Sequence, residues 1–366
     1  LIPGVGCPRG CNFCSTSALF GGKGRSIDFY RTGAELFEIM CGIEEDLDIK
    51  GFFVMDENFL LNKNRALELL DLMETHNKPW YLKVFSSVDV IRKWTPDLLV
   101  ALGVTWIWMG LEGENTQYRK LAGVDTRKLV RSLQAHGIRV LGSSIIGLEN
   151  HAPQNMEGVI DYAVSHDADM HQFMLYTPIP GTPFYDEMKA KDALSSYTDI
   201  QVGDIHGQLR FNYRHQHLVD GAETELLLRA FHRDFKVNGP SIVRIARTLL
   251  QGWKRHKNHA NARVRDRFAY EADDLPVRYA GAVWAARERY RDDPHRHRII
   301  SQVLDELYAE FGRKSRRAAP ILGRHLYQSL CHEEERLQKG WTYEPPTFYT
   351  TNCVDQPEGA IPVVGV

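Results

Sequence analysis

Three cysteines near the start of the chain constrain its fold and chemistry more than any other feature. Cys7, Cys11 and Cys14 follow a C-x3-C-x2-C spacing. Three thiolates on one short loop can bind three irons of a four-iron, four-sulfur cluster and leave the fourth iron open to a small molecule. Phe13, directly before the third cysteine, would give such a cluster an apolar neighbour that helps to set its potential. The spacing therefore predicts a [4Fe-4S] cluster with one open coordination position.

The alternative for these cysteines is a zinc site. Zinc in proteins takes four ligands, and the last of them usually come from a second pair of cysteines or histidines at similar spacing. No such pair follows, and the other cysteines, Cys41, Cys331 and Cys353, are scattered along the sequence. We therefore favour the cluster and expect these three cysteines to be uninvolved.

Composition narrows the class of protein further. The 366 residues are 43% hydrophobic and 25% charged with a net charge of −2, which is typical of a globular protein without general attraction to nucleic acid or anionic membrane. We see no apolar run long enough for a membrane span and no signal peptide ahead of the cysteines. Because oxygen destroys an accessible cluster and the cysteines do not form a disulfide pattern, we expect a cytoplasmic location.

Strand and helix patterns alternate over the first half of the chain. Strands are predicted at residues 1–5, 51–55, 80–85, 105–109, 139–146 and 171–176. Strict alternation with helices requires parallel strands, whose carboxyl ends meet at one rim. No G-x-G-x-x-G follows the first strand, so a dinucleotide-binding fold is not supported. The prediction is an α/β fold, a partial (βα)6 barrel over residues 1–195.

In the second half of the chain the alternation of strand and helix patterns stops. Helices are predicted at residues 223–235, 241–256, 276–290, 298–311 and 319–338, which makes residues 196–344 a mainly helical C-terminal region. Residues 345–366 are expected to be extended or disordered. Between residues 241 and 330 there are 19 Lys or Arg against 10 Asp or Glu. These basic helices could bind RNA, but we favour a solvated or docking surface and do not expect nucleic acid as a partner.

The cysteine motif, with its aromatic residue before the third cysteine, resembles that of the radical S-adenosylmethionine (SAM) superfamily. The resemblance implies a partial barrel, a [4Fe-4S] cluster and reductive cleavage of SAM to a 5′-deoxyadenosyl radical that acts on a small-molecule substrate. It also implies an electron donor, either a reductase or a flavodoxin or ferredoxin. It assigns no catalytic side chain beyond those that hold the cofactors.

Matching positions at the strand ends are implied to contact the cluster or SAM. They are Phe13 beside the cluster, Asp56, Glu57 and Asn58 after the second strand, Ser86 and Ser87 after the third, Glu112 after the fourth, Ile145 and Gly147 at the fifth, and Tyr176 and Pro178 at the sixth. At the fifth strand the chain departs from the family pattern, because Ser143 and Asn150 stand where a glycine and an acid are usual.

The motifs at residues 56–59, 110–112 and 180–183 are similar to those of the cobalamin-associated branch of the superfamily. This resemblance implies cobalamin as a further cofactor and methylation of an unactivated carbon. Since the chain starts with Leu1 rather than Met, we expect a cobalamin-binding domain upstream. The alternatives are a cobalamin-independent ring closure, oxidation or rearrangement, or, in another class, a non-catalytic iron-sulfur or zinc protein that binds RNA.

Overall fold

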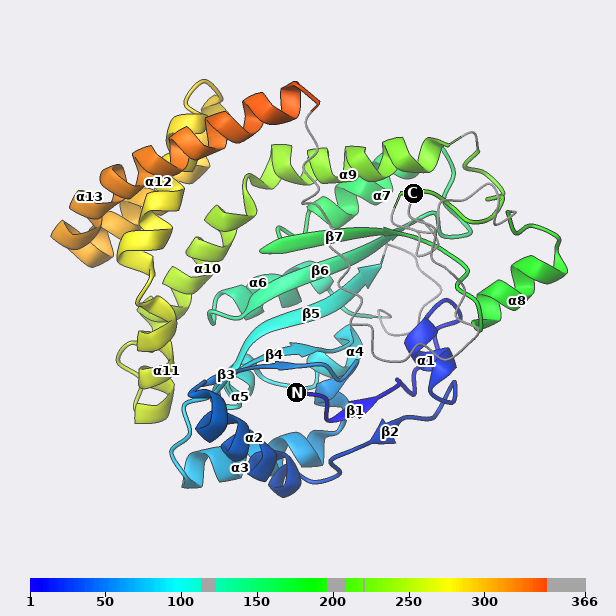
Figure 1. The fold of residues 1–366 in the computed structure, drawn as a ribbon, viewed down its shortest axis with the longest axis horizontal. Helices are drawn as coiled ribbons and strands as arrows, with labels where there is room; N and C mark the ends of the chain where they lie inside the picture. The colour runs from blue at the N-terminus through cyan, green and yellow to red at the C-terminus, as the bar shows by residue number, and fades with distance from the viewer. Residues whose placement is uncertain (113–122, 196–208, 220, 341–366) are drawn as a thin grey trace, which may run out of the picture.

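The centre of the molecule is a five-stranded parallel sheet. A computed structural model describes residues 1–112, 123–195, 209–219 and 221–340. The strands lie in the sheet in the order in which they occur along the chain (Figure 1). They are β3 (Gly51–Val54), β4 (Tyr81–Phe85), β5 (Val104–Glu112), β6 (Arg139–Ile146) and β7 (Met170–Leu175). This parallel sheet with its intervening helices confirms the predicted α/β partial barrel.

The helices of the first half connect and cover these strands. They are α1 (Ser15–Leu19), α2 (Gly33–Leu47), α3 (Lys63–Thr75), α4 (Val88–Ile91), α5 (Pro96–Ala101), α6 (Thr126–Gln134), α7 (Met156–Val164) and α8 (Pro183–Ala190), with a 3-10 turn η1 at Phe59–Leu61. The sequence fixes the start of α2, where Thr32 accepts a hydrogen bond from the backbone N–H of Glu35 and the Glu35 side chain accepts one from Thr32.

The strand predicted at residues 1–5 is wrong in its pairing. Strand β1 (Gly4–Val5) pairs antiparallel with β2 (Ile27–Asp28) in a separate two-stranded sheet. Only Leu1 reaches the main sheet, where its backbone N–H and C=O pair with Phe53 and Met55 at the edge of β3. The parallel sheet of the described residues therefore has five strands rather than six.

The second half is helical, as predicted. It contains α9 (Ala222–Asn238), α10 (Ser241–His256), α11 (Ala262–Ala272), a π-helical turn η4 (Leu275–Tyr279), α12 (Ala280–Arg289) and α13 (Pro294–Gln338). Element α13 consists of two helical segments separated by the non-helical backbone of Gly312 (φ 57°, ψ −127°), in agreement with the last two predicted helices. Helix α11 was not predicted. The predicted tail, residues 345–366, lies outside the described residues.

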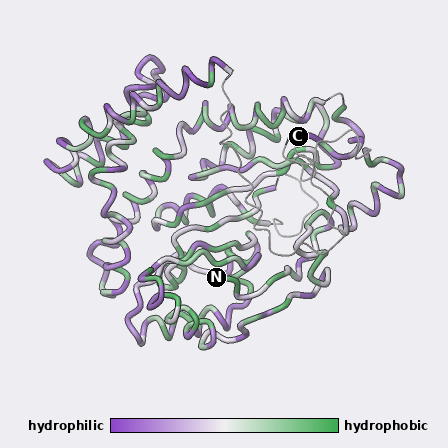
Figure 2. The backbone as a smooth tube through the Cα atoms, in the orientation of Figure 1, coloured by the Kyte–Doolittle hydropathy of each residue, from purple (hydrophilic) through white to green (hydrophobic). Residues whose placement is uncertain are grey.

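Hydrophobic side chains form one large core and two smaller ones. The large core lies between β3, β4 and β5 and their helices, and it includes Val264 and Phe268 of α11. A second core lies under β6 and β7, and a third joins α10, α12 and α13. Hydrophobic stretches follow the strands and the inner sides of the helices in Figure 2. The helical region is therefore connected to the barrel mainly through α9, α10 and α11.

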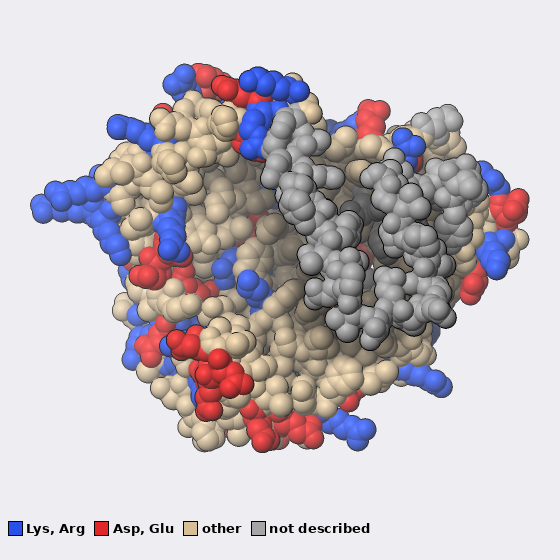
Figure 3. Space-filling model, viewed as in Figure 1, with Lys and Arg blue, Asp and Glu red and all other residues tan. Residues whose placement is uncertain are grey.

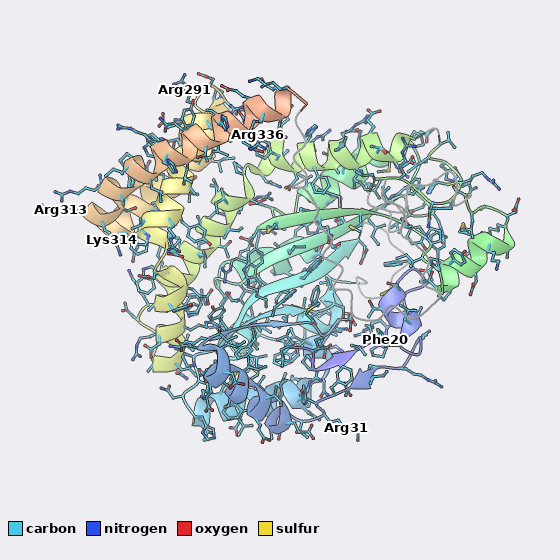
Figure 4. The ribbon with its side chains drawn as sticks, in the orientation of Figure 1. Phe20, Arg31, Arg291, Arg313, Lys314 and Arg336 are labelled. Carbon is cyan, nitrogen blue, oxygen red and sulfur yellow. The ribbon has the colours of Figure 1, made fainter. Side chains whose placement is uncertain are left out.

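Charge is spread unevenly over the visible face of the molecule. Acidic side chains gather over α2 and α3, whereas basic ones stand at the outer end of the helical region (Figure 3). There Arg313 and Lys314 of α13 point away from the rest of the chain (Figure 4). Other basic residues of this region, such as Arg263 and Arg267, are only 3% exposed. Fewer basic side chains are therefore exposed on the helical region than its count of Lys and Arg suggests.

Candidate functional site at the carboxyl ends of the strands

The cysteine loop is a closed turn held by its own backbone. The N–H of Cys14 donates to the carbonyl of Cys11 (3.1 Å), and the Ser17 hydroxyl donates to the carbonyl of Cys7 (2.7 Å). Gly10 has a φ of +67°, and a Cβ there would lie 2.5 Å from the Cβ of Lys23. Only glycine therefore allows the loop to fold this tightly against the turn that follows α1.

The thiols of this loop lie close enough to influence one another. Burial raises the pKa of Cys7 and the nearby Cys14 raises it further, while the backbone N–H and charge of Arg9 and a hydrogen bond from the Asn58 side chain lower it. A half-buried pair of thiols fits a cluster, because its irons supply the positive charge that two neighbouring thiolates need.

A single metal ion fits this loop less well. The described part of the chain contains no group of three or more His, Cys, Asp or Glu side chains that could hold one metal ion. The three cysteines do not have to converge on one point to bind a cubane cluster, because each thiolate takes a different iron. The geometry therefore favours the cluster over the zinc alternative.

Contacts from two distant strands hold the cysteine loop at the rim of the sheet. Arg9 forms an ion pair with Asp89 of α4, just after β4 (2.5 Å). On the other side, the Asn12 amide donates to the hydroxyl of Tyr176, at the end of β7 (2.9 Å), and the Phe13 ring meets the Tyr176 ring edge-on. The loop therefore spans the rim from β4 to β7. The sequence had suggested neither Arg9 nor Asp89.

Asn58 connects the second and third strand ends. Its side-chain oxygen accepts hydrogen bonds from the Ser86 hydroxyl (2.8 Å) and the Ser87 backbone N–H (3.0 Å). Its backbone N–H donates to Asp56 (3.0 Å). Four of the five residues predicted at these two strand ends are thus brought together by hydrogen bonds to Asn58.

Asp56 and Glu57, neighbours in the sequence, have different environments. Asp56 forms an ion pair with Arg65 of α3, which is 2% exposed. In contrast, Oε2 of Glu57 is buried and has no hydrogen-bond partner. Burial raises the pKa of Glu57 and the Asp56 charge raises it further, while hydrogen bonds from the N–H groups of Glu57 and Gly6 lower it. Within the part of the chain that the structure describes, the Glu57 carboxylate therefore forms no ion pair.

Arg65 was missed in the sequence, although a signal was present. It shares the buried face of α3 with Leu69, one helical turn further on. An arginine in the apolar stripe of a helix indicates a buried partner.

Glu112 ends β5 in an unusual backbone conformation. It is 4% exposed, has a φ of +47° and follows an irregularity in the pairing of β5 with β6. Positive φ is costly for a residue with a side chain, so the surrounding structure must hold Glu112 in place. Such a fixed carboxylate at a strand end is consistent with its predicted role, which stays a prediction.

The predicted residues at the last two strands are covered by a later segment. Gly147 has a φ of +86°, and a Cβ there would lie 2.4 Å from the ring of Phe211. The carbonyl of Pro178 accepts a hydrogen bond from Asn212 (2.8 Å). Ile145 and Tyr176 are buried in the core that contains Phe211. These four residues therefore contact residues 211 and 212 or their core, which the sequence did not suggest.

Among the described residues, no helix is both long and apolar enough to cross a bilayer.

Comparisons with known proteins agree with this geometry. The model of the radical SAM superfamily matches residues 1–163. A bacteriochlorophyllide d C-12(1)-methyltransferase of Chlorobaculum tepidum is 28% identical over 193 residues, which are 50% of this chain and 41% of the relative. A biotin synthase of Corynebacterium glutamicum is 26% identical over 226 residues, 56% of this chain and 62% of the relative.

A solved structure of the radical SAM methyltransferase TsrM from Kitasatospora setae, with tryptophan and a SAM analogue bound, aligns with a TM-score of 0.45 and 20% identity. The alignment covers 55% of this chain and 41% of that one. The chain thus spans less than two thirds of each of these three proteins.

Proposed function

We propose that the chain, whose residues 1–163 match the model of the radical SAM superfamily, is a radical SAM enzyme with a [4Fe-4S] cluster and SAM as cofactors. We further propose that the whole protein methylates an unactivated carbon of a small molecule with the help of cobalamin. Residues 1–195 would form the catalytic domain, and residues 196–344 a helical region that supports it. The site would need a low-potential electron donor and a reducing cytoplasm, since oxygen destroys accessible clusters.

In this proposal Cys7, Cys11 and Cys14 bind three irons of the cluster. When bound, the cluster and SAM supply a 5′-deoxyadenosyl radical that removes a hydrogen atom from the substrate. The task of the chain is to hold both cofactors at the rim and to keep water away. The contacts of Arg9 and Asn12 with opposite sides of the sheet fix the cysteine loop for this purpose.

The observation that carries the proposal is the half-buried carboxylate of Glu57, whose oxygen Oε2 is buried without a hydrogen-bond partner among the described residues. A buried carboxylate without a cation is costly, and native structures normally give such a group a partner. Here Oε2 lies on a residue whose pKa is lowered by the backbone N–H of Gly6, directly before Cys7, so the carboxylate is close to the cysteine loop. The ammonium group of SAM would be the missing cation. Glu57, rather than the already paired Asp56, is then the acid that positions SAM.

Methylation is supported by two further points. The motifs at residues 56–59, 110–112 and 180–183 resemble those of the cobalamin-associated branch, and one relative is named a methyltransferase. The other relative is named a biotin synthase. A cobalamin-independent radical reaction is therefore the second candidate.

One assay separates these candidates. The protein, expressed with any sequence that precedes Leu1, is reconstituted anaerobically with iron and sulfide and mixed with dithionite, hydroxocobalamin and SAM carrying a ¹³C-labelled methyl group. We expect 5′-deoxyadenosine together with labelled methylcobalamin. Formation of 5′-deoxyadenosine without any labelled methylcobalamin would favour the cobalamin-independent reaction. Absence of SAM cleavage by a preparation with a full cluster would contradict both.

A further inference from the structure

We infer that the substrate is a planar, conjugated ring compound with an anionic group, and that it binds on one face of the sheet against Phe85 and Trp108 and beside Lys83. The inference rests on the proposed function in one respect, namely that the bound molecule is the substrate. It adds the chemical class of that substrate, which the motifs at the strand ends do not specify.

The two faces of strands β3, β4 and β5 differ in how their side chains pack. Successive side chains of a strand point to opposite faces of the sheet. On one face they belong to the large core and are at most 4% exposed: Phe52, Val54, Leu82, Val84, Ile107 and Met109. On the other, here called the inner face, they belong to none of the three cores of the described residues: Phe53, Lys83, Phe85, Trp106, Trp108 and, on β6, Leu141. The inner face is therefore rich in aromatic side chains that no described core uses.

Three rings of the inner face form one continuous surface. The ring centroids of Phe53 and Phe85 lie 5.4 Å apart, and those of Phe85 and Trp108 lie 4.8 Å apart. Phe53, at the edge of this surface, is 44% exposed. Aromatic rings attract a further flat ring by offset stacking or edge-to-face contact, which a saturated hydrocarbon cannot make. The surface therefore favours a planar, conjugated ligand.

Helix α11 lies against the inner face at the amino end of the strands (Figure 1). Tyr270 of α11 stacks on Tyr81, the first residue of β4, with ring centroids 5.5 Å apart. The Arg139 guanidinium lies 5.2 Å from the centre of the Trp106 ring and pairs with Glu271 of α11. The aromatic surface is thus bounded by α11 on this side.

Towards the carboxyl end the same surface continues to the rim that carries the cysteine loop. Ser86, which follows Phe85 directly, donates to Asn58 at the rim. Gly110, two residues beyond Trp108 on β5, has no side chain that could separate the Trp108 ring from the rim. A flat molecule on Phe85 and Trp108 would therefore have one edge towards the cysteine loop, where the proposed radical forms.

Lys83 supplies a positive charge on the inner face. It is exposed and lies in register between Phe53 and Trp106. Among the described residues it has no ion pair or hydrogen bond, whereas Arg139 is paired with Glu271. A lysine without an acidic partner favours an anionic ligand. Mostly aromatic side chains with one charged group are typical of a small-molecule site.

The test is calorimetric titration of the anaerobically reconstituted 366-residue chain with three probes that share one carbon skeleton. 2-Naphthoate is flat and anionic, naphthalene-2-carboxamide is flat and neutral, and decahydro-2-naphthoate is anionic but saturated. We expect 2-naphthoate to bind about fivefold more tightly than the amide and about tenfold more tightly than the saturated acid.

Two substitutions assign these preferences to the inner face. Lys83→Met removes the charge but keeps the length of the side chain, so 2-naphthoate and the amide should bind equally. Trp108→Leu removes a ring, so the preference over the saturated acid should disappear. Because neither residue belongs to a core of the described chain, both variants should unfold in urea like the wild type. The control is Lys314→Met, at a lysine that points away from the rest of the chain, and it should change neither preference (Figure 4).

Equal affinities of the wild type for the three probes would overturn the inference, as would a preference that survives its own substitution. Failure of the intact chain to bind any probe would overturn it too. Binding that appears only after removal of residues 345–366 would assign the inner face to the chain's own tail instead.

SAM cleavage is measured on the same preparation, so that two failures can be told apart. A chain that shows both preferences but does not cleave SAM would contradict the proposed function and leave a binding site for planar anions. A chain that cleaves SAM but binds the three probes equally would overturn the inference alone.

Discussion

Buried charged side chains are paired differently at the two ends of the parallel strands. At the amino end, Glu271 of α11 bonds to Thr105 at the start of β5 and pairs with Arg139, the first residue of β6, and with Arg267. Each charge there has an opposite charge within reach. At the carboxyl end, Glu57 has an oxygen that is buried without a partner. The two ends therefore differ in ion pairing: Glu271 has two cations within reach although its Oε1 accepts no hydrogen bond, whereas Glu57 forms no ion pair among the described residues.

The largest expected effect is at the carboxyl end. The triple variant Cys7→Ala, Cys11→Ala and Cys14→Ala should retain less than about one of about four irons per chain after anaerobic reconstitution. Its unfolding free energy in urea should match that of the wild-type chain without a cluster, because the loop is also held by Arg9 and Asn12.

Cys41→Ala is the control, and it should bind iron like the wild type. Retention of four irons by the triple variant would remove these cysteines from the cluster.

At the amino end the expected effect is on stability. Glu271→Gln leaves Arg139 and Arg267 buried without their opposite charge, which should lower the free energy of unfolding by about 3 kcal/mol. Urea unfolding measures this loss. Iron content per folded chain should not change, because the site lies at the other end of the strands. An unchanged unfolding curve would refute the distinction between the two ends.

A buried histidine near the amino end of the strands should make the free energy of unfolding depend on pH. Burial and nearby positive charge lower the pKa of His256 to about 4, and both ring nitrogens are buried without a partner. The folded chain therefore binds fewer protons here than the unfolded chain, so stability falls as pH drops from about 6.5 towards 4. His256 should account for at most about 2 kcal/mol of the loss between pH 7 and pH 5.

His256→Phe, which keeps the stacking on Phe268, should reduce this pH dependence in urea unfolding at both pH values. The same change at His232, an exposed residue, is the control and should leave it unaltered. Equal pH dependence in the wild type and His256→Phe would contradict the assignment.

Sequence reasoning succeeded where a local pattern determines the structure. The alternation of strands and helices predicted that residues after different strands would meet at one rim, where Asn58 bonds to Ser86 and Ser87. It could not distinguish Asp56 from Glu57, because their environments depend on Arg65 from a different helix.

Sequence reasoning failed where the type of a residue does not indicate which way its side chain points or how its strand pairs. Helix α11 was missed because Arg263 and Arg267 point inward and donate to the carbonyls of Ala101 and Val100, so the polar face of the helix is also its buried face. The pairing of β1 was missed because its two residues carry no pattern that distinguishes an antiparallel edge from a barrel strand.

The most direct test makes the same change, glutamate to glutamine, at one residue of each end of the strands. Glu57→Gln removes the unpaired charge but keeps the shape of the side chain. The account predicts that SAM binds at least about tenfold more weakly to the reconstituted chain, about 1.4 kcal/mol. The free energy of unfolding should be unchanged or higher, because the buried oxygen of residue 57 then carries no charge. Glu271→Gln should show the reverse, a loss of stability with unchanged SAM affinity. If the Glu57→Gln variant with a full cluster binds SAM as tightly as the wild type, the claim that the Glu57 carboxylate binds SAM is contradicted.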